Sequence, residues 1–563
     1  GAIVLLGNNT TVNLSINPQV SESITVTAAA PVVDTTRTGT AQSVTEEQIE
    51  NLPILGRDFK ALAQLTPGVA SAFGGRITSN GARGIATDFN IDGASSNNDF
   101  FGEQTGGTRA PFTFSQAAIK EFQVIRSQYN AEYGRGVGAQ LNAITKSGSN
   151  EFDGEAFYFL RKTAWASTRP TRLPNGVAVT DSFRGRNSTQ PGFAVGGPIQ
   201  HDRLFFFVNF DGQRQKLPVS ATDIRRNATF SALPEATRTA FFAKVQGLIG
   251  FPYEQGIEYD QSFDQDTYLI KLDANVGSKN HFSLRDNYTS FENGNNQSFN
   301  HLSNQGVETD KFNQLVLQGE TVFTGNLFNQ FLAQYTSDER PVDPNTTTPE
   351  VVVTYAPNTT VFLGQNDFLP NNTKEKKIQL KDSIQYIWND HTFKVGAEGL
   401  LMSIDNLFPR NLSGVYRYNS VQDFIDNKPA SFNQGFGPGG GLTSWDQNTY
   451  ALFVSDSFRV GTHLTFDAGV RYDWQTIPEP ETNAFPQHPE FITQIEEDKD
   501  NYAPRFGFAW DLLGTGRSVL RGGTGKFFGY MPDILLSNPL TQISGNFNQV
   551  TISNCALATN VVP

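Results

Sequence analysis

Beyond Asn150 the sequence alternates, residue by residue, between apolar and polar side chains, and this pattern constrains the fold more than any other feature. The clearest run is residues 463–474, in which every second side chain is apolar. Successive side chains of a strand point to opposite faces, so one face of such a strand suits hydrocarbon and the other suits water. Residues 267–276 and 378–388 alternate in the same way.

About thirteen such runs lie between residues 155 and 528. Each is close to the roughly 9 to 11 residues that a tilted strand needs to cross a bilayer, and many carry Phe, Tyr or Trp at their ends. Short turns, such as residues 277–280, contrast with long polar stretches, such as residues 341–373 and 416–448. This pattern predicts a transmembrane antiparallel β-barrel. A soluble β-sandwich explains the alternation, but not so many long runs with aromatic ends.

The composition excludes several other classes of protein. Only 18% of the residues are charged, while Gly and Phe number 51 and 46. The net charge of −13 argues against nucleic-acid binding, which needs a basic face. No run of about 18 apolar residues occurs, so the sequence offers no transmembrane helix. Cys555 is the single cysteine, and its pairing partner, if it has one, lies beyond Pro563.

The sequence contains no recognisable catalytic or cofactor motif. The six His residues have no metal-ligand spacing, and no Gly-x-Ser-x-Gly elbow stands out. Residues 134–138 are glycine-rich but lack the strand-then-helix context of a nucleotide loop. We therefore expect no enzymatic activity and no cofactor.

The first residues have a mixed pattern. Residues 1–27 alternate around a Gly-Asn-Asn turn and are typical of the last strands of a small β domain, which we expect to begin further upstream. Residues 28–44 are typical of an extended linker. Thr45 and Gln48 form a capping box, which predicts a helix over residues 46–51. A second helix is predicted over residues 58–65, and its buried face is expected to hold Phe59, Leu62 and Leu65.

Residues 129–149 join the two parts of the chain. They follow a strand expected over residues 121–126, and they combine a glycine-spaced polar hinge with a short apolar strand. The glycines at 134, 136 and 138 are expected to let the backbone turn tightly and approach the barrel wall closely.

Several motifs follow one another before residue 160. They are TEEQI with LP and GR (residues 45–57), GARG (81–84), NIDG (90–93), IKEFQVI (119–125), YG (133–134) and NAITKSG (142–148). With these motifs in this order, the segment from Thr45 to about Leu160 is similar to the plug domain of TonB-dependent outer-membrane receptors, and in detail to the Oar-like subfamily. Residues 1–27 resemble the end of the Ig-like, carboxypeptidase-regulatory-type domain that often precedes such plugs.

The resemblance implies a barrel of about 22 strands with the plug inside its lumen, and active import driven by an inner-membrane energy-coupling complex. About thirteen strands are visible, and the last residues lack the terminal aromatic of a closing strand, so we expect the C-terminal part of the barrel to be missing. The expected division is a mainly β chain with a β-domain end and candidate TonB box (1–27), a linker (28–44), an α+β plug (45–150) and barrel strands with extracellular loops (151–563).

The candidate TonB box is residues 22–28, a β-prone segment that would pair as an added strand with the periplasmic coupling protein. Its key residues are Glu22, Ile24, Thr25 and Val26. The alternative is an ordinary last strand of the preceding domain.

The resemblance also places certain plug loops toward the extracellular side, where aromatic rings beside amides suit a ligand with apolar and polar groups. The candidate ligand-binding residues are Arg76, Asn97, Asn98, Asp99, Phe100, Phe101 and Arg109. The alternative is a disordered loop rich in Gly and Asn.

Two further predictions concern charge. The spacing of Asp88, Asn90, Asp92 and Asp99 matches a calcium loop, although neither flank reads as a helix, so a plug strand is the preferred interpretation. Enclosed by a barrel, Arg83 and Arg126 would need carboxylate partners, and we expect plug–barrel ion pairs with acids such as Asp467 or Glu398. Surface arginines are the alternative.

We therefore expect a TonB-dependent receptor in the Gram-negative outer membrane that couples ligand binding outside to energised import. The expected partners are a TonB-type inner-membrane complex, outer-membrane lipid and a peptide, protein or oligosaccharide ligand, with a surface lipoprotein or other envelope protein as a further candidate. One alternative is a structural or adhesive envelope protein without transport. Another is a SusC-like glycan importer with a lipoprotein lid.

Overall fold

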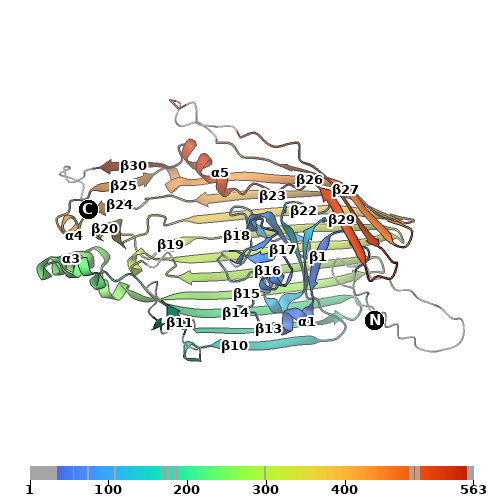
Figure 1. The fold of residues 1–563 in the computed structure, drawn as a ribbon, viewed down its shortest axis with the longest axis horizontal. Coiled ribbons are helices and arrows are strands. Elements are labelled where there is room, and N and C mark those ends of the chain that lie inside the picture. Colours follow the sequence, from blue (N-terminus) through green and yellow to red (C-terminus); the bar gives the residue numbers. More distant parts are fainter. Residues whose placement is uncertain are drawn as a thin grey trace.

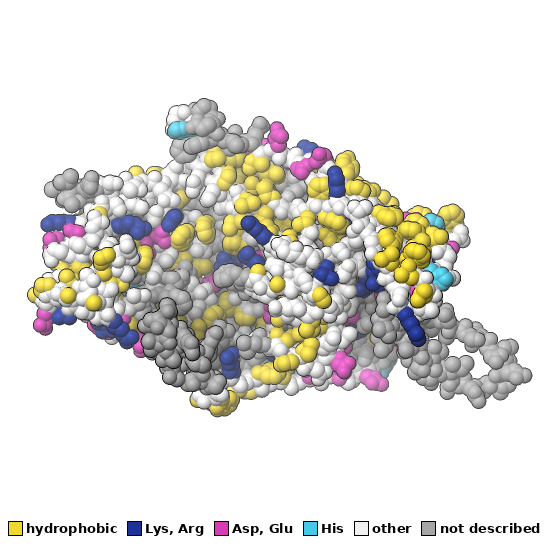
Figure 2. Space-filling model, in the orientation of Figure 1, with side chains coloured by type: hydrophobic (Ala, Val, Ile, Leu, Met, Phe, Trp, Pro, Cys, Tyr) yellow, Lys and Arg dark blue, Asp and Glu magenta, His cyan; other side chains and the backbone are white. Residues whose placement is uncertain are grey.

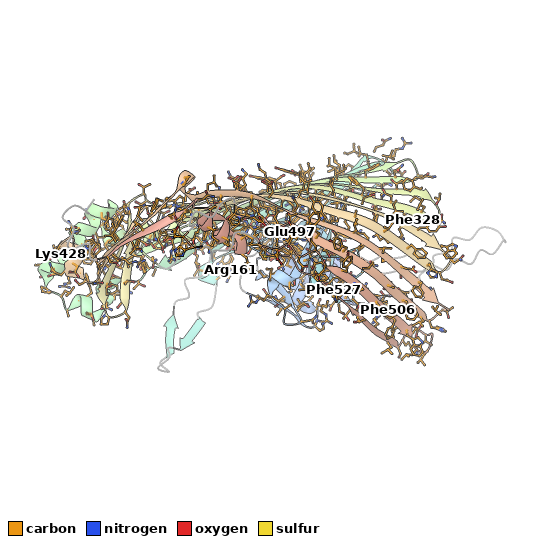
Figure 3. All side chains as sticks on the ribbon, turned by 90° about the horizontal axis from the view of Figure 1, so that it is seen from above. Arg161, Phe328, Lys428, Glu497, Phe506 and Phe527 are labelled. Atoms are coloured by element: carbon orange, nitrogen blue, oxygen red, sulfur yellow. The ribbon has the colours of Figure 1, made fainter. Side chains whose placement is uncertain are left out.

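A curved antiparallel sheet, which we call the wall, carries a small inner domain on its concave side in the computed structural model (Figures 1 and 3). The inner domain lies in front of the middle strands of the wall in Figure 1. The structure describes residues 34–54, 56–72, 75–106, 109–165, 169–172, 178–181, 187–296, 300–480, 487–488 and 495–553.

The wall consists of thirteen strands in sequential antiparallel order, with the short β19 (Val342–Pro344) paired beside β17. This agrees with the predicted number. The thirteen strands are β10 (Asp153–Arg161), β13 (Asn187–Gln200), β14 (Leu204–Ser220), β15 (Glu258–Val276), β16 (Asn280–Gly294), β17 (Gly306–Thr324), β18 (Leu327–Glu339), β22 (Asn372–Trp388), β23 (His391–Leu407), β26 (Leu442–Val460), β27 (Leu464–Gln475), β28 (Tyr502–Asp511) and β29 (Val519–Gly525).

The two faces of the wall differ as the alternation predicts. On β26, Leu452 is 61% exposed and Val454 is 47% exposed, whereas the neighbouring Ala451 and Phe453 are buried against the concave side. Outward apolar side chains on successive strands produce a hydrocarbon-facing surface. Figure 2 shows hydrophobic side chains gathered over the right-hand end of the wall.

Most of the wall strands are longer than the predicted 9 to 11 residues. β15, β17 and β26 each contain 19 residues. At one end of the wall the strands are joined by tight turns, such as the one at Gly277, where φ is 68°. At the other end the connections are long.

Three of the long connections fold together, which corrects the expectation that residues 341–373 and 416–448 are polar loops. Their four strands and β30, which follows the last wall strand, form a five-stranded sheet in the order β21-β20-β24-β25-β30. Helices pack on it around a core that includes Phe230, Phe241 and Val353. We call this unit the loop domain; it lies at the left-hand end in Figure 1. Its elements are α2 (Ala228–Ser231), α3 (Glu235–Ile249), β20 (Glu350–Ala356), β21 (Thr359–Leu363), β24 (Val415–Tyr418), α4 (Val421–Ile425), β25 (Ser431–Phe436) and β30 (Asn548–Ser553).

The inner domain has a five-stranded sheet in the order β1-β8-β9-β4-β5. The predicted helix over residues 46–51 is confirmed, and the Thr45 N–H donates to Oε1 of Gln48 at 3.1 Å. The second predicted helix is a 3-10 helix, η1 (Phe59–Leu65), with Leu65 exposed instead of buried. The elements are β1 (Thr40–Val44), α1 (Glu46–Asn51), β2 (Val69–Ser71), β3 (Ile77–Ser79), β4 (Thr87–Ile91), β5 (Ala94–Ser95), β6 (Asn97–Asn98), β7 (Glu103–Gln104), β8 (Ile119–Ser127) and β9 (Ala139–Thr145).

Four further elements are short. They are β11 (Arg169–Arg172), β12 (Ala178–Asp181), α5 (Ile534–Asn538) and the π-helical turn η10 (Pro539–Ile543). The last two follow the last wall strand. Within the described residues, no helix is both long and apolar enough to cross a membrane.

The loop domain should lose stability as the pH rises through neutrality, because it buries Glu350. Burial raises the pKa of this carboxyl group to about 7, despite the hydrogen bond that Asn304 donates to it at 2.8 Å. A carboxyl whose pKa is raised on folding stabilises the fold fully below its unfolded pKa, and this contribution is lost as the pH passes the folded value. Hydrogen exchange of the β20 and β24 amides, corrected for intrinsic rates, should show about 1–3 kcal/mol less protection at about pH 8 than at about pH 5.

Glu350→Gln should remove most of this pH dependence, because the amide keeps an acceptor for Asn304 and does not titrate. The exposed Glu235 on α3 offers a matched control, and Glu235→Gln should leave the pH dependence as it is in the parent protein. An unchanged pH dependence in Glu350→Gln would show that another group is responsible.

Candidate functional site

The hinge predicted at residues 129–149 lies inside the concave face of the wall, and the wall holds it by its backbone. The guanidinium of Arg505, on β28, donates to the carbonyl oxygens of Tyr129, Asn130 and Tyr133 at 3.3, 2.7 and 2.7 Å. Phe527 packs on Tyr129 with ring centroids 4.6 Å apart and ring planes tilted by 55°, and it lies beside the inner domain in Figure 3. We call residues 128–138, which connect β8 to β9, the hinge loop.

A second wall arginine holds the next residues of the hinge loop. Arg471, on β27, donates to the carbonyl oxygen of Glu132 at 3.2 Å and pairs with Glu398 at 3.0 Å and with Asp473 at 2.8 Å. The side chain of Glu132 forms an ion pair with Lys394. A side chain at Gly134 would place its Cβ 2.5 Å from the Arg471 guanidinium, so the close approach to the wall requires glycine here.

The predicted approach to the wall is wrong for the other two glycines. A Cβ at Gly136 would meet the carbonyl oxygen of Ala139 at 2.7 Å, and a Cβ at Gly138 would meet Ala82 at 3.0 Å. Both glycines therefore allow close packing within the inner domain itself and not against the wall.

On the other side, the inner domain is anchored to wall strands β16 to β18. Asp92 pairs with Arg285 at 2.8 Å and accepts hydrogen bonds from the N–H and hydroxyl of Thr145 at 2.9 and 2.8 Å. The carbonyl oxygen of Ser95 accepts from the side-chain amides of Gln314 and Gln334 at 3.0 and 2.9 Å.

The residues predicted to form exposed ligand-binding loops are largely buried, and most of them form ion pairs or hydrogen bonds with other side chains. The prediction that they form an exposed surface site is therefore wrong. Asp99 forms ion pairs with Arg135 and Lys377, and these cations hold its pKa below the usual range although burial alone would raise it. Phe100 is only 1% exposed. The other candidates lie as follows: Asn97 donates to Asp88, Asn98 donates to Asp338, Arg76 pairs with Glu103, Arg109 pairs with Glu308, and Phe101 lies under Arg109.

A segment that the sequence analysis did not single out covers these loops. Residues 526–543 leave the last wall strand and pack between the inner domain and β23 and β26. The Ile534 N–H donates to the carbonyl oxygen of Phe100 at 2.9 Å, and the indole of Trp445 donates to Asp533 at 2.8 Å. Burial, with Asp99 and Glu375 nearby, raises the pKa of Asp533 well above its usual range. The sequence signal was the aromatic run Phe527–Phe528–Gly529–Tyr530.

A hollow of about 690 Å³ lies on η10 and the start of β30. Its lining side chains combine amides with apolar groups, and none carries a formal charge when histidine is neutral. They are His488, Asn538, Pro539, Gln542, Ile543, Phe547, Asn548 and Gln549.

A second, more enclosed cavity of about 400 Å³ separates part of the inner domain from the wall, toward the short-turn end. We call it the inner cavity. Its lining carries both signs of charge. From the inner domain come Asp88, Asp92, Glu132 and Arg135, and from the wall come Lys271, Asp273, His281, Lys381, Lys394 and Glu398.

The preferred interpretation of the calcium-like spacing as a plug strand agrees with β4, which contains Asp88 and Asn90, and the four alternative calcium ligands do not converge. Asp88 accepts from Asn90 and Asn97 at 2.7 Å each, whereas Asp92 and Asp99 pair with separate cations. Among the residues that the structure describes, no group of three His, Cys, Asp or Glu is arranged to hold a metal.

The two predicted plug–barrel ion pairs are also wrong. Arg83 is exposed, and Arg126 donates to Asn80 at 3.5 Å. Of the proposed partners, Asp467 accepts from Thr38 at 2.6 Å and Glu398 pairs with Arg471. The arginines that join the two parts are Arg109 of the inner domain, which pairs with Glu308 of β17, and the wall arginines Arg285, Arg471 and Arg505. The candidate TonB box, with Glu22, Ile24, Thr25 and Val26, and Cys555 lie outside the described residues.

Removing the charge of Arg471 should loosen the hinge loop. Arg471→Met leaves the half-buried Glu398 and Asp473 without this cation, and it removes the donor to the carbonyl oxygen of Glu132. We expect hydrogen exchange at residues 129–136 to show about 2–4 kcal/mol less protection.

The matched control is Arg214→Met, which removes an exposed arginine paired with Asp266 at 2.7 Å. It should cost no more than about 1 kcal/mol, because solvent screens exposed pairs. Equal effects of the two substitutions would contradict the assigned role of Arg471.

Comparison with known proteins identifies both parts. Residues 34–139 match the model of the TonB-dependent receptor plug domain, and residues 144–254 and 227–563 match that of the outer membrane beta barrel domain. TonB-dependent transporter Oar of Myxococcus xanthus is 23% identical over 547 residues, which cover 83% of this chain and 50% of that protein. This chain thus spans half the length of the curated relative.

Solved structures share the fold. The outer membrane transporter YddB from Escherichia coli superposes with a TM-score of 0.63 at 13% identity, covering 91% of this chain and 63% of that one. The siderophore receptor PirA from Acinetobacter baumannii superposes with a TM-score of 0.55 at 16% identity, covering 87% of this chain and 61% of that one. The inner domain is a plug, the wall is part of an outer-membrane β-barrel, and the chain belongs to the TonB-dependent receptor family of the Gram-negative outer membrane.

Proposed function

We propose that this chain is the plug and much of the barrel of a transporter that binds a ligand outside the cell and imports it with energy supplied from the periplasm. The observation that carries the proposal is the polar attachment of the hinge loop. Arg471 and Arg505 hold its backbone carbonyl oxygens, and such bonds can break and re-form without unfolding the domain.

The proposed energy source is a TonB-type inner-membrane complex that pulls on residues 22–28. These residues precede β1, the edge strand of the inner-domain sheet. A segment attached to an edge strand can transmit force without first disrupting the centre of the sheet. We propose no enzymatic role.

The proposed ligand site is the hollow on η10 and β30, and not the buried loops around Phe100. Its amides and apolar groups suit a peptide, protein or oligosaccharide ligand. A surface lipoprotein or another envelope protein is a further candidate partner, as in SusC-like importers. The element α5, which precedes η10, contacts Phe100 directly and so connects this hollow to the inner domain.

Deleting residues 22–28 from the complete protein that carries this chain should abolish cross-linking to the TonB-type coupling protein in living cells. The barrel should still assemble, because these residues precede the first strand of the inner domain. An equally long deletion of residues 12–18 serves as the control and should preserve the cross-link.

Persistent cross-linking without residues 22–28 would exclude them as the coupling segment. If the parent protein never cross-links, the alternative of a structural or adhesive envelope protein without transport is favoured.

A further inference from the structure

An acidic side chain interrupts the apolar outward face of β22. Asp382 lies in register with Phe331 of β18 and with Ala397 of β23, both on the hydrocarbon-facing side of the wall. Every other outward side chain around it on β22 is aliphatic or aromatic and exposed. These neighbours are Ile378, Leu380, Ile384, Tyr386 and Trp388.

Asp382 lies near the middle of this face along the membrane normal. It is six residues from Trp388 and four from Ile378. At ~3.3 Å per residue and a strand tilt of about 40°, these separations correspond to roughly 15 and 10 Å along the normal. The apolar band of such barrels is about 25 Å tall, so the carboxyl group lies inside it. A charged group at that depth is costly unless a partner inside the membrane pairs with it.

The wall supplies this carboxyl group with a hydrogen bond but not with a cation. Asn329 of β18 donates to Oδ1 of Asp382 at 2.7 Å and to the carbonyl oxygen of Ser383 at 3.1 Å. Within the described part of the chain, no Lys, Arg or His forms an ion pair with Asp382. The amide therefore holds the carboxyl group on the surface but leaves its charge uncompensated.

A groove of about 660 Å³ lies beside Asp382 on the same face. Ala397 and Gly399 of β23 form its floor, since the side chains in register with them on β26, Leu452 and Tyr450, are much larger. A floor of small residues lets the backbone of another membrane-embedded segment approach closely. The site thus combines an apolar groove with one uncompensated carboxylate.

Lipid and a second copy of the chain would each leave this carboxylate unpaired. Hydrocarbon chains carry neither charge nor hydrogen-bond donors, and charged lipid headgroups lie at the interfaces, outside the apolar band. In the described wall strands, the other outward charges set between apolar side chains are Asp286 on β16 and Asp456 on β26, which are also acidic. Two copies of this face would therefore oppose charges of the same sign. A protein that presents a cation from its own apolar surface complements the site.

We propose that the groove beside Asp382 is a docking site, within the membrane, for a different protein whose membrane-embedded segment carries a lysine or arginine at the depth of Asp382. The ammonium or guanidinium group pairs with this carboxylate, and the apolar side chains around it lie over Ala397 and Gly399. The ion pair sets the depth and register of the partner, while the apolar contacts displace lipid. This proposal does not depend on the proposed transport function, because the site faces away from the inner domain.

Photo-cross-linking in living cells tests the proposal. In the complete protein, the photoreactive residue benzoylphenylalanine replaces Leu452, which is 61% exposed at the edge of the groove. Illumination should produce an adduct with one other membrane protein. Asp382→Asn should lower the adduct yield at least about tenfold, because the amide keeps an acceptor for Asn329 but loses the charge. Asp382→Glu should keep most of the adduct.

The matched control is Asp286→Asn. Asp286 is also an outward carboxylate that accepts from an asparagine, Asn313, at 3.1 Å, but it does not line the groove. Its substitution should leave the adduct yield unchanged. Benzoylphenylalanine in place of Leu272, which is exposed on β15 away from the groove, should give no protein adduct. Heat-modifiable electrophoresis should show full barrel assembly in Asp382→Asn, which removes a charge from the membrane-facing surface.

Charge reversal establishes the pair directly. Asp382→Lys should abolish the adduct with the identified partner. Replacing the facing lysine or arginine of the partner by aspartate should then restore the adduct to the Asp382→Lys protein.

The absence of a protein adduct, an adduct with a second copy of this chain, or an adduct that Asp382→Asn leaves unchanged would overturn the proposal. A partner without a cation in its embedded segment, or a reversed pair that fails to restore the adduct, would also overturn it. Failure of Asp382→Asn to assemble would show that Asp382 supports the wall itself and would refute the docking role.

Discussion

The structure depends on the polar, concave face of the wall. This face must supply hydrogen-bond partners for the buried polar groups of the folded domain that lies against it. Backbone groups buried there need partners as strong as water. Arg505 supplies three carbonyl oxygens with donors, and Gln314 and Gln334 supply another. Because these bonds involve the backbone of the inner domain, they specify its position without requiring particular side chains from it. The same alternation that gives the wall a hydrocarbon face thus provides the attachment on the other face.

Local sequence patterns predicted the secondary-structure elements and the direction in which their side chains face. Alternation over residues 463–474 identified both a strand and its outward face, and the capping box at Thr45 identified a helix start. The close approach at Gly134 was also predictable, because only glycine allows it. The Oar-like plug motifs placed residues 129–149 against the barrel. The sequence signal for each of these features lies in residues that are neighbours in the chain.

The wrong predictions concern contacts between distant segments. Phe100 was expected to be exposed, but α5, which begins more than 400 residues later in the chain, covers it. Arg83 and Arg126 were expected to pair with wall carboxylates, but Arg109 forms such a pair instead, with Glu308. The wall arginines Arg285, Arg471 and Arg505 extend in the opposite direction. No local pattern states which of two facing surfaces carries the cation, since both arrangements satisfy the same charges.

The balance between apolar and polar contacts also bears on how such a domain can be both retained and moved. A buried ion pair adds little net stability, because desolvation offsets much of the attraction, but its loss leaves costly unpaired charges. The Glu132–Lys394 pair can therefore favour one position of the hinge loop strongly while the loop contributes little to the stability of the domain. Hydrophobic packing around Phe207 and Phe312 adds net stability instead, because separating these side chains from the inner domain exposes apolar area to water. The inner domain is held by both kinds of contact, and the ion pairs specify its position while the apolar packing resists its separation from the wall.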